Sequence, residues 1–410
     1  MIIRYKNRVL SNGNYWTFEL KGVQFPLSQI DFYFSSPSSL VVDYGDGAVV
    51  TYTSGTANRI QLSAGINSNA SALYPAYFYT TGDAKTLRTV KLKLLEPAKL
   101  IKLYSGYAAN VVGVFPARFS QTPNLDTLSI SAYLISGIDE TYLLLRSIRT
   151  LSLRNVFQQG TRYYGIIPVD VINNKSYISF GYSSSLGGKR FSESNLDKIA
   201  PALKNTLTTL AIDSNKLQDQ NGVDGGLPEN FAELTQLVTL NLNSNLYTVP
   251  PVVLNTMLSL TTLSMSQVPL VSWGNLSALV KLGSFTVSSA ALPPVVPAYL
   301  AVLTKLKAFR FSGAFGGPEN AALFISSFYE FVIANAVIVG ASSLPFRDMT
   351  ITAGSEAGVN SAATGHILTG SYQPPVGYVQ GSANGSPAST LEMIYVLEKQ
   401  YAHNWSYRTA

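Results

Sequence analysis

The chain has 410 residues, enough for two or three domains or for one extended domain with attachments. Hydrophobic residues make up 46% of it, which excludes a disordered chain, while the charged share of 13% is about half of the usual value of roughly 25%. The absence of Cys excludes disulfides and thiolate metal sites, and the net charge of +6 is dispersed along the chain, which argues against nucleic-acid binding.

Residues 1–85 are predicted to be β structure, because short segments of alternating polar and apolar residues are separated by turn residues. These segments are NYWTFELKG, IDFYFSS, LVVDYGDGAVVTYTSG and RIQLSAG. In VDYGDG, Gly45 and Gly47 permit positive φ, and Asp43 and Asp46 can accept hydrogen bonds from turn amides. The segment resembles the D-x-G-D-G turn of PKD-like β-sandwich modules and the Y/W-G-D-G segment that precedes leucine-rich repeats in some bacterial and phage surface proteins. The resemblance implies an N-terminal β-sandwich that docks the protein.

A pattern of two large residues separated by one outward residue recurs through the middle of the chain. Segments of this kind begin at residues 89, 127, 150, 177, 209, 239, 262, 284 and 308. From the second segment onward the steps between them lie between 22 and 32 residues. Such a period predicts a solenoid, in which each turn contributes one short parallel strand.

The central turns carry a more specific signature. Leu207, Leu210, Ile212, Asn215 and Leu217 fit the pattern L-x-x-L-x-L-x-x-N-x-L and resemble a leucine-rich repeat. GGLPENFAELTQLVTLNLNSN resembles the Pro-containing return segment of the same family. The resemblance implies a solenoid with a parallel sheet over residues 86–351. The segments at 177 and 284 lack the Asn, so a continuous Asn ladder is not predicted.

The last part of the chain, residues 352–410, is predicted to be a Gly/Ser-rich loop followed by a helical cap. Two starts of the helix are open: Ser386 as N-cap with Pro387 at the first position, or a capping box of Ser389 and Glu392. Leu391, Ile394, Leu397 and Tyr401 would then share the buried face. GSYQPPVGYVQGSANGSPAST resembles C-termini of phage-encoded proteins of Bacteroidota. The whole chain is therefore expected to be mainly β with short helices.

Exposed positions offer two kinds of surface for binding. The outward residues of the predicted strands are mostly Thr, Ser and Asn, which favours a solvated sheet face without anchor residues. Tyrosines concentrate in predicted loops, where Arg162, Tyr163, Tyr164 and Tyr182 are candidates for contact with a sugar or a protein. The alternative is that these tyrosines pack beneath the loops.

Residues that carry catalysis or bind metals are sparse. His366 and His403 lie in predicted loops without a carboxylate nearby on a helix, which argues against a catalytic triad or a His metal site. The segment DQNGVDGG offers Asp219, Asn221 and Asp224 as calcium ligands, but it departs from the EF-hand pattern, and a solvated loop is favoured. No cofactor is expected, and the chain is predicted not to be an enzyme.

The predicted function rests on two features. A surface rich in hydroxyl, amide and phenol groups is common in proteins that work outside the cell, and the N-terminus lacks the apolar core of a signal peptide. No apolar run is long enough to cross a bilayer. Together these features favour a structural and recognition protein of a phage particle, in the tail, a fibre or the baseplate. It would assemble in the host cytoplasm, be released by lysis, and contact other virion proteins and a host-surface protein or glycan. A bacterial surface adhesin and a carbohydrate-active enzyme are the alternatives.

Overall fold

The chain divides into two compact units, which are treated separately below. The first comprises Met1–Tyr164 and Asn173–Tyr177, and the second comprises Gly165–Ile172 and Ile178–Ala410. The domain boundaries predicted after residues 85 and 351 do not coincide with this division and stay predictions. The computed structural model describes residues 16–21, 30–43, 47, 49–65, 76–78, 87–105, 111–115, 122–131, 135–138, 147–154, 166–173, 176–183, 194–218, 227–291, 293, 295–306, 308–314, 318–339, 350–353, 370–401 and 404–405.

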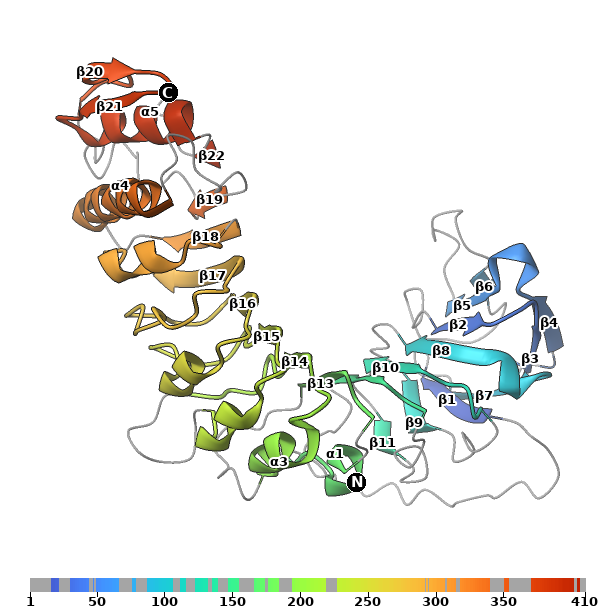
Figure 1. The fold of residues 1–410 in the computed structure, drawn as a ribbon. Helices are drawn as coiled ribbons and strands as arrows, with labels where there is room; N and C mark the ends of the chain where they lie inside the picture. Colours follow the sequence, from blue (N-terminus) through green and yellow to red (C-terminus); the bar gives the residue numbers. More distant parts are fainter. Residues whose placement is uncertain are drawn as a thin grey trace. The chain divides into compact units, whose positions relative to one another are not determined.

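Over its described residues, the first unit consists of β-strands and short 3-10 helices. Its elements are β1 (Trp16–Lys21), β2 (Ile30–Phe34), β3 (Ser39–Asp43), β4 (Val49–Thr53), η1 (Gly55–Ala57), β5 (Arg59–Gly65), β6 (Ala76–Phe78), β7 (Leu87–Leu94), η2 (Pro97–Lys99), β8 (Leu100–Ser105), β9 (Val111–Phe115), β10 (Thr127–Ser131), β11 (Ile135–Ile138) and β12 (Thr150–Arg154). One sheet has the order β11-β9-β1-β7-β3-β4, and the other strands run β12-β10-β8-β2-β5-β6 (Figure 1).

Alternation of side chains gives each sheet of the first unit a buried apolar face. Phe32 and Phe34 of β2 and Leu103 of β8 are buried in one sheet, and Leu40 of β3 and Leu92 of β7 in the other. The residues between them in sequence face the opposite side, because successive side chains of a strand point to opposite faces. The predicted β structure of residues 1–85 is therefore confirmed for the described strands.

One segment predicted to be a solenoid strand lies in an antiparallel sheet instead. The segment at residue 89 lies in β7, which pairs antiparallel with β1 and β3. The parallel pairing begins instead with β8, which pairs parallel with β10, and β10 in turn with β12. The sequence pattern misled here because alternation reports that one strand face is buried and does not report strand direction.

The second unit is a solenoid with one strand per turn. Its strands run in the order β13 (Ser179–Ser183), β14 (Thr209–Ala211), β15 (Thr239–Asn241), β16 (Thr262–Met265), β17 (Ser284–Ala291), β18 (Ala308–Ala314), β19 (Thr350–Ala353) and β22 (Asn404–Trp405), and neighbours in this order pair in parallel. Short helices on the return segments are α1 (Val169–Ile172), η5 (Leu196–Lys198), α3 (Ile199–Leu203), η6 (Glu229–Glu233), η7 (Val252–Thr256) and η8 (Ala298–Val302). Figure 1 shows strands along one side of this stack and return helices along the other. The predicted parallel solenoid is confirmed.

A recurring proline starts several of the return turns. Pro228, Pro251 and Pro297 each precede a 3-10 helix with φ between −57° and −69°, the range that the proline ring enforces. The carbonyl of each accepts a hydrogen bond from the amide three residues later, at 3.0 Å in all three turns. The residue at that third place is a large apolar one and is buried in each case, namely Phe231, Leu254 and Leu300. The proline therefore sets the angle at which the return segment enters the core.

The predicted Asn position forms two rungs of a ladder. Asn245 Oδ1 accepts hydrogen bonds from the amides of Asn215 (3.0 Å) and Leu217 (3.1 Å), and its Nδ2 donates to the carbonyls of Ile212 and Leu242, both at 2.9 Å. One turn earlier, Asn215 Nδ2 donates to the carbonyl of Tyr182 at 2.8 Å. In the next turn Val268 takes the corresponding place and is buried, so the ladder ends there.

The register of the turn at residue 177 differs from the sequence-based alignment by two residues. Ser179, rather than Tyr177, pairs with Thr209, and Phe180 pairs with Leu210. Tyr177 therefore stands in the place of Leu207 and is 0% exposed. A shift of two preserves the alternation of inward and outward residues, which is why the pattern alone could not reveal it.

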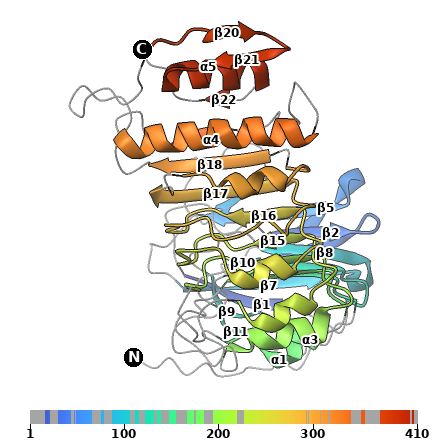
Figure 2. The ribbon, with the colours of Figure 1, turned by 60° about the vertical axis from the view of Figure 1, so that its left-hand side comes forward.

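The C-terminal part contains two helices and a hairpin. Helix α4 (Pro318–Val339) contacts η8, and α5 (Thr390–Tyr401) contacts α4; Figure 2 shows α4 and α5 one above the other beyond β18. The hairpin of β20 (Val376–Val379) and β21 (Ala383–Ser386) is fastened to α5, because Gln400 Oε1 accepts a hydrogen bond from Gly381 N at 2.7 Å. The predicted helical cap with buried Leu391, Ile394, Leu397 and Tyr401 is confirmed. The 22-residue helix α4 was not predicted.

Candidate functional site

The outward side chains of the solenoid form one regular polar surface, the polar sheet face. It is defined by Thr209, Ala211, Asp213, Thr239, Asn241, Asn243, Thr262, Ser264, Ser266, Ser284, Thr286 and Ser288. All of them are half-buried, while the residues that alternate with them in β14 to β17 are buried. Neighbouring rows are in register, with Thr239 paired to Thr209 and Thr262 paired to Thr239. The predicted face of hydroxyl and amide groups is thus present.

Hydrogen bonds between neighbouring turns hold this polar sheet face in one arrangement. Asn243 Oδ1 accepts hydrogen bonds from Ser264 Oγ (2.8 Å) and Ser266 N (2.6 Å). One turn further, Ser288 Oγ accepts from Gln267 N at 2.9 Å. The donors and acceptors of the face are therefore partly used within the protein. The twelve residues that define the polar sheet face include no Trp, Tyr or Arg, the residues that most often contribute binding energy at protein interfaces.

A second surface, in the first unit, does carry such residues. We name it the aromatic polar face and define it by Asp31, Tyr33, Arg59, Gln61, Lys102 and Tyr104. These residues lie on β2, β5 and β8 and alternate with the buried Ile30, Phe32, Ile60, Leu62 and Leu103. Pairing sets Asp31 opposite Gln61 and Tyr104, and Tyr33 opposite Arg59 and Lys102. Directly opposed residues of antiparallel strands share a face, so all six project from the same side of the sheet.

The side chains of the aromatic polar face are fixed by one another. Arg59 donates to Asp31 Oδ1 from Nη2 at 3.0 Å and from Nε at 3.3 Å. Its guanidinium carbon lies 5.2 Å from the centre of the Tyr33 ring, within the range of a cation–π contact. Tyr33 in turn meets Tyr104 edge to face, with ring centres 5.6 Å apart. Tyr33, Arg59 and Tyr104 are half-exposed, so this face offers rigid anchors of the kind that binding surfaces use.

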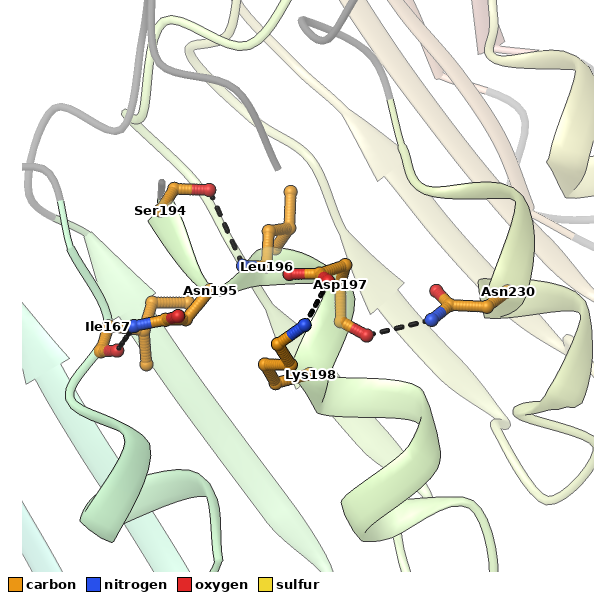
Figure 3. Close-up of polar contacts among 7 residues, drawn as sticks. All are labelled: Ile167, Ser194, Asn195, Leu196, Asp197, Lys198 and Asn230. Carbon is orange, nitrogen blue, oxygen red and sulfur yellow. Dashed lines mark hydrogen bonds and ion pairs between the residues drawn. The ribbon is translucent and has the colours of Figure 1, made fainter. Parts of the chain in front are cut away.

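A third cluster of polar groups joins three successive return segments of the solenoid. Figure 3 shows Asn195 Nδ2 donating to the carbonyl of Ile167 at 2.9 Å, and Asn230 Nδ2 donating to the carbonyl of Asp197 at 2.7 Å. Asp197 Oδ2 is paired with Lys198 Nζ at 2.6 Å. The carboxylate is therefore neutralised by its own neighbour. This cluster stabilises the stacking of the turns and offers no charge to a ligand.

Of the four residues predicted to contact a ligand, the structure describes one, Tyr182. Tyr182 is 1% exposed, and its hydroxyl donates to the carbonyl of Ile166 at 3.0 Å. It occupies the place of Ile212 in the repeat, so it belongs to the core, and the prediction that it contacts a ligand is corrected. Arg162, Tyr163 and Tyr164 lie outside the described residues and stay predictions.

The weak calcium candidates Asp219, Asn221 and Asp224 also lie outside the described residues. Within the part of the chain that the structure describes, no three His, Cys, Asp or Glu side chains cluster as metal ligands would. Over the same residues, no helix combines the length and the apolar character that a membrane crossing needs.

Sequence reasoning missed the aromatic polar face, although a signal was available. In IDFYF the polar residues Asp31 and Tyr33 alternate with Ile30, Phe32 and Phe34, so both project from one side of the strand. Two other segments, RIQL and IKLY, show the same alternation. Which strands are neighbours was the missing information, because strand order across the sheet leaves no trace in the alternation.

Comparisons with known proteins find likeness of structure only. No family model and no curated protein sequence matches the chain. Solved structures that resemble it include the LRR ectodomain of the plant membrane receptor kinase GASSHO1/SCHENGEN3 from Arabidopsis thaliana (15% identity, TM-score 0.32, covering 60% of this chain and 36% of that one). A second is a Leptospira interrogans LRR protein (15% identity, TM-score 0.37, covering 59% of this chain and 57% of that one). A third is the functional domain of InlJ from Listeria monocytogenes (17% identity, TM-score 0.33, covering 57% of this chain and 51% of that one).

The chain thus spans between 36% and 57% of the length of these structures. Likeness at this level carries no argument about function. The description of the second unit as a leucine-rich-repeat-like solenoid therefore depends on its own geometry, namely the parallel strands in register, the Asn ladder and the return turns.

Proposed function

We propose that this chain is a non-enzymatic recognition protein that contacts its partner through the aromatic polar face of the first unit. The observation that supports this most is the combination of half-exposed Tyr33, Arg59 and Tyr104 with the bonds that hold them in place. Tyr and Arg are enriched among the residues that contribute most to binding. Because their positions are already fixed, little side-chain entropy is lost when a partner binds.

In this proposal the solenoid of the second unit is a rigid support. Its polar sheet face uses part of its hydrogen-bonding groups internally and carries no aromatic anchor, so we assign it solubility and spacing rather than primary contact. The contact surface thereby moves from the Tyr-rich loops, as predicted from the sequence, to a sheet face in the first unit.

The finer proposal concerns where the protein acts. We propose that it is a component of a phage particle, in contact with other virion proteins and with a host-surface protein or glycan. The low share of charged residues, 13%, and the resemblance of the C-terminal segment to phage-encoded proteins support this proposal. A bacterial surface adhesin of the same architecture is the competing assignment.

Labelling in electron micrographs separates the two assignments. An antibody raised against the second unit is applied to particles and cells from a culture that produces the chain. Label on tails or other parts of the particle is the expected result. Label restricted to the cell envelope of particle-free cells would favour the adhesin.

Binding of the fluorescently labelled full chain to host cells tests the contact surface. We expect the double variant Tyr33→Ala, Arg59→Ala to bind at least about 30-fold more weakly, since each anchor contributes roughly 1 kcal/mol or more at a binding surface. The matched control is Thr239→Ala, Thr262→Ala on the polar sheet face, which should bind as the unaltered chain does. Equal loss in both double variants, with unchanged circular dichroism, would contradict the assignment of the contact to the first unit.

A further inference from the structure

Two polar side chains of the aromatic polar face are buried as deeply as core residues. Asp31 and Gln61 are each 8% exposed, and they stand directly opposite each other on β2 and β5. Their neighbours Tyr33, Arg59 and Tyr104 are half-exposed. The face therefore has a polar floor, with aromatic and guanidinium groups beside it.

Among the residues that the structure describes, the carboxamide of Gln61 has no hydrogen-bond partner. Neither Oε1 nor Nε2 meets a donor or acceptor, although both atoms are buried. Asp31, directly opposite, accepts two hydrogen bonds from Arg59 on Oδ1. Almost all buried polar groups in folded proteins are paired, since an unpaired one destabilises the fold. An amide retained in this state is therefore typical of a functional position rather than of a structural one.

The surroundings of Gln61 narrow the chemistry of a ligand. A carboxamide presents two donor hydrogens and one acceptor oxygen, and adjacent hydroxyl groups of a sugar ring can both donate and accept. The Tyr33 and Tyr104 rings offer apolar surface for the C–H faces of such a ring. Asp31 and Arg59 neutralise each other beside Gln61, which suits an uncharged ligand at the amide. The remaining charge of the face is that of the exposed Lys102, which lies opposite Tyr33.

We infer that the aromatic polar face is a carbohydrate site in which Gln61 hydrogen-bonds a pair of adjacent hydroxyls of a neutral pyranose. The inference rests on the proposed function and names its ligand class. Because Gln61 is 8% exposed, the sugar reaches it when a neighbouring side chain turns outward.

Thermal unfolding tests whether the amide is unpaired. Gln61→Leu removes two unpaired polar atoms at similar volume, so we expect the melting temperature of the full chain to rise by about 2–4 °C. Gln400→Leu is the matched control, because Gln400 is also 8% exposed but accepts a hydrogen bond from Gly381 N, and this variant should melt earlier. A drop for Gln61→Leu of the same size as for Gln400→Leu would show that the amide is bonded within the protein, and would overturn the inference.

Saturation-transfer NMR on the full chain tests the ligand class. The probes are methyl α-D-mannopyranoside, methyl β-D-galactopyranoside and methyl β-D-glucopyranoside, with N-acetyl-alanine methylamide as a peptide-like competitor. We expect transfer to at least one sugar, and its loss in Gln61→Leu. Transfer to the amide alone, or to no probe, would overturn the carbohydrate assignment.

The two proposals can fail separately. If host-cell binding depends on Tyr33 and Arg59 but no sugar shows transfer, the recognition function stands with a protein partner and the carbohydrate site falls. If a sugar binds through Gln61 but the chain does not bind host cells, the carbohydrate site stands and host recognition falls.

Discussion

At the scale of single residues, the solenoid depends on side chains that satisfy backbone groups across turns. Asn245 connects four backbone groups of two adjacent turns, and it is 1% exposed. The sequence pattern identified this position, because an Asn three places after the last large residue of the strand is a signature of the repeat. The burial of Tyr182 was not identified, since its turn lies two residues away from the register that the pattern favours.

Replacing the ladder residue should destabilise the second unit strongly. In Asn245→Ala the amides of Asn215 and Leu217 lose their acceptor inside the core, and we expect a loss of roughly 3 kcal/mol in the free energy of unfolding. Urea denaturation measures it. Asn275→Ala is the control, because the Asn275 side chain is exposed and accepts its hydrogen bonds from Ser277, two residues away. A change of less than about 1 kcal/mol in Asn245→Ala would contradict the role of the ladder.

At the scale of elements, the helix boundaries were partly predictable. Of the two predicted starts of α5, the one at Ser389 forms: Ser389 Oγ accepts a hydrogen bond from Glu392 N at 3.3 Å. Glu392 Oε2 accepts from Ala388 N at 2.6 Å, one residue before the Ser389 amide that a capping box uses. Ser386 instead ends β21, so its role as N-cap was wrong. Helix α4 was missed, although Phe324, Phe328 and Phe331 recur at helical spacing and are buried together.

Substitution at the two candidate caps should separate them. Ser389→Ala removes the acceptor for the Glu392 amide, and we expect a loss of about 1 kcal/mol and faster hydrogen exchange in the first turn of α5. The Ser386 side chain is exposed and lies outside the helix, so Ser386→Ala should change the free energy of unfolding by no more than about 0.5 kcal/mol. The capping assignment fails if the two variants are equally stable.

At the scale of the whole molecule, alkaline pH should loosen the second unit. Burial raises the pKa of Tyr299 to about 12, and burial together with nearby Tyr401 raises the pKa of Tyr329 to about 12. In the unfolded chain a tyrosine ionises near pH 10, so between pH 10 and 12 the unfolded state holds fewer protons than the folded state. The stabilisation is therefore fully present below pH 10 and is lost as the pH rises toward 12.

Denaturant midpoints measured from pH 9 to pH 12 check this expectation. The fall should be shallower in Tyr299→Phe, because a phenyl ring cannot ionise in either state. Lysines also lose their charge in this range, but they do so in both proteins, so the difference between the two curves isolates Tyr299. Parallel curves would show that Tyr299 does not contribute.

The sequence by itself determined the β-rich class of the chain, the repeat of the central turns and the residues that form their core. These features are local: alternation, the spacing of leucines and the Asn three places beyond the strand are written in consecutive residues. Only the tertiary structure decided that β7 pairs antiparallel outside the parallel array and that Tyr182 is buried. It also brought Asp31, Arg59, Gln61 and Tyr104 together from three strands. Strand order and register decide such neighbours, and alternation is the same whichever strand lies alongside.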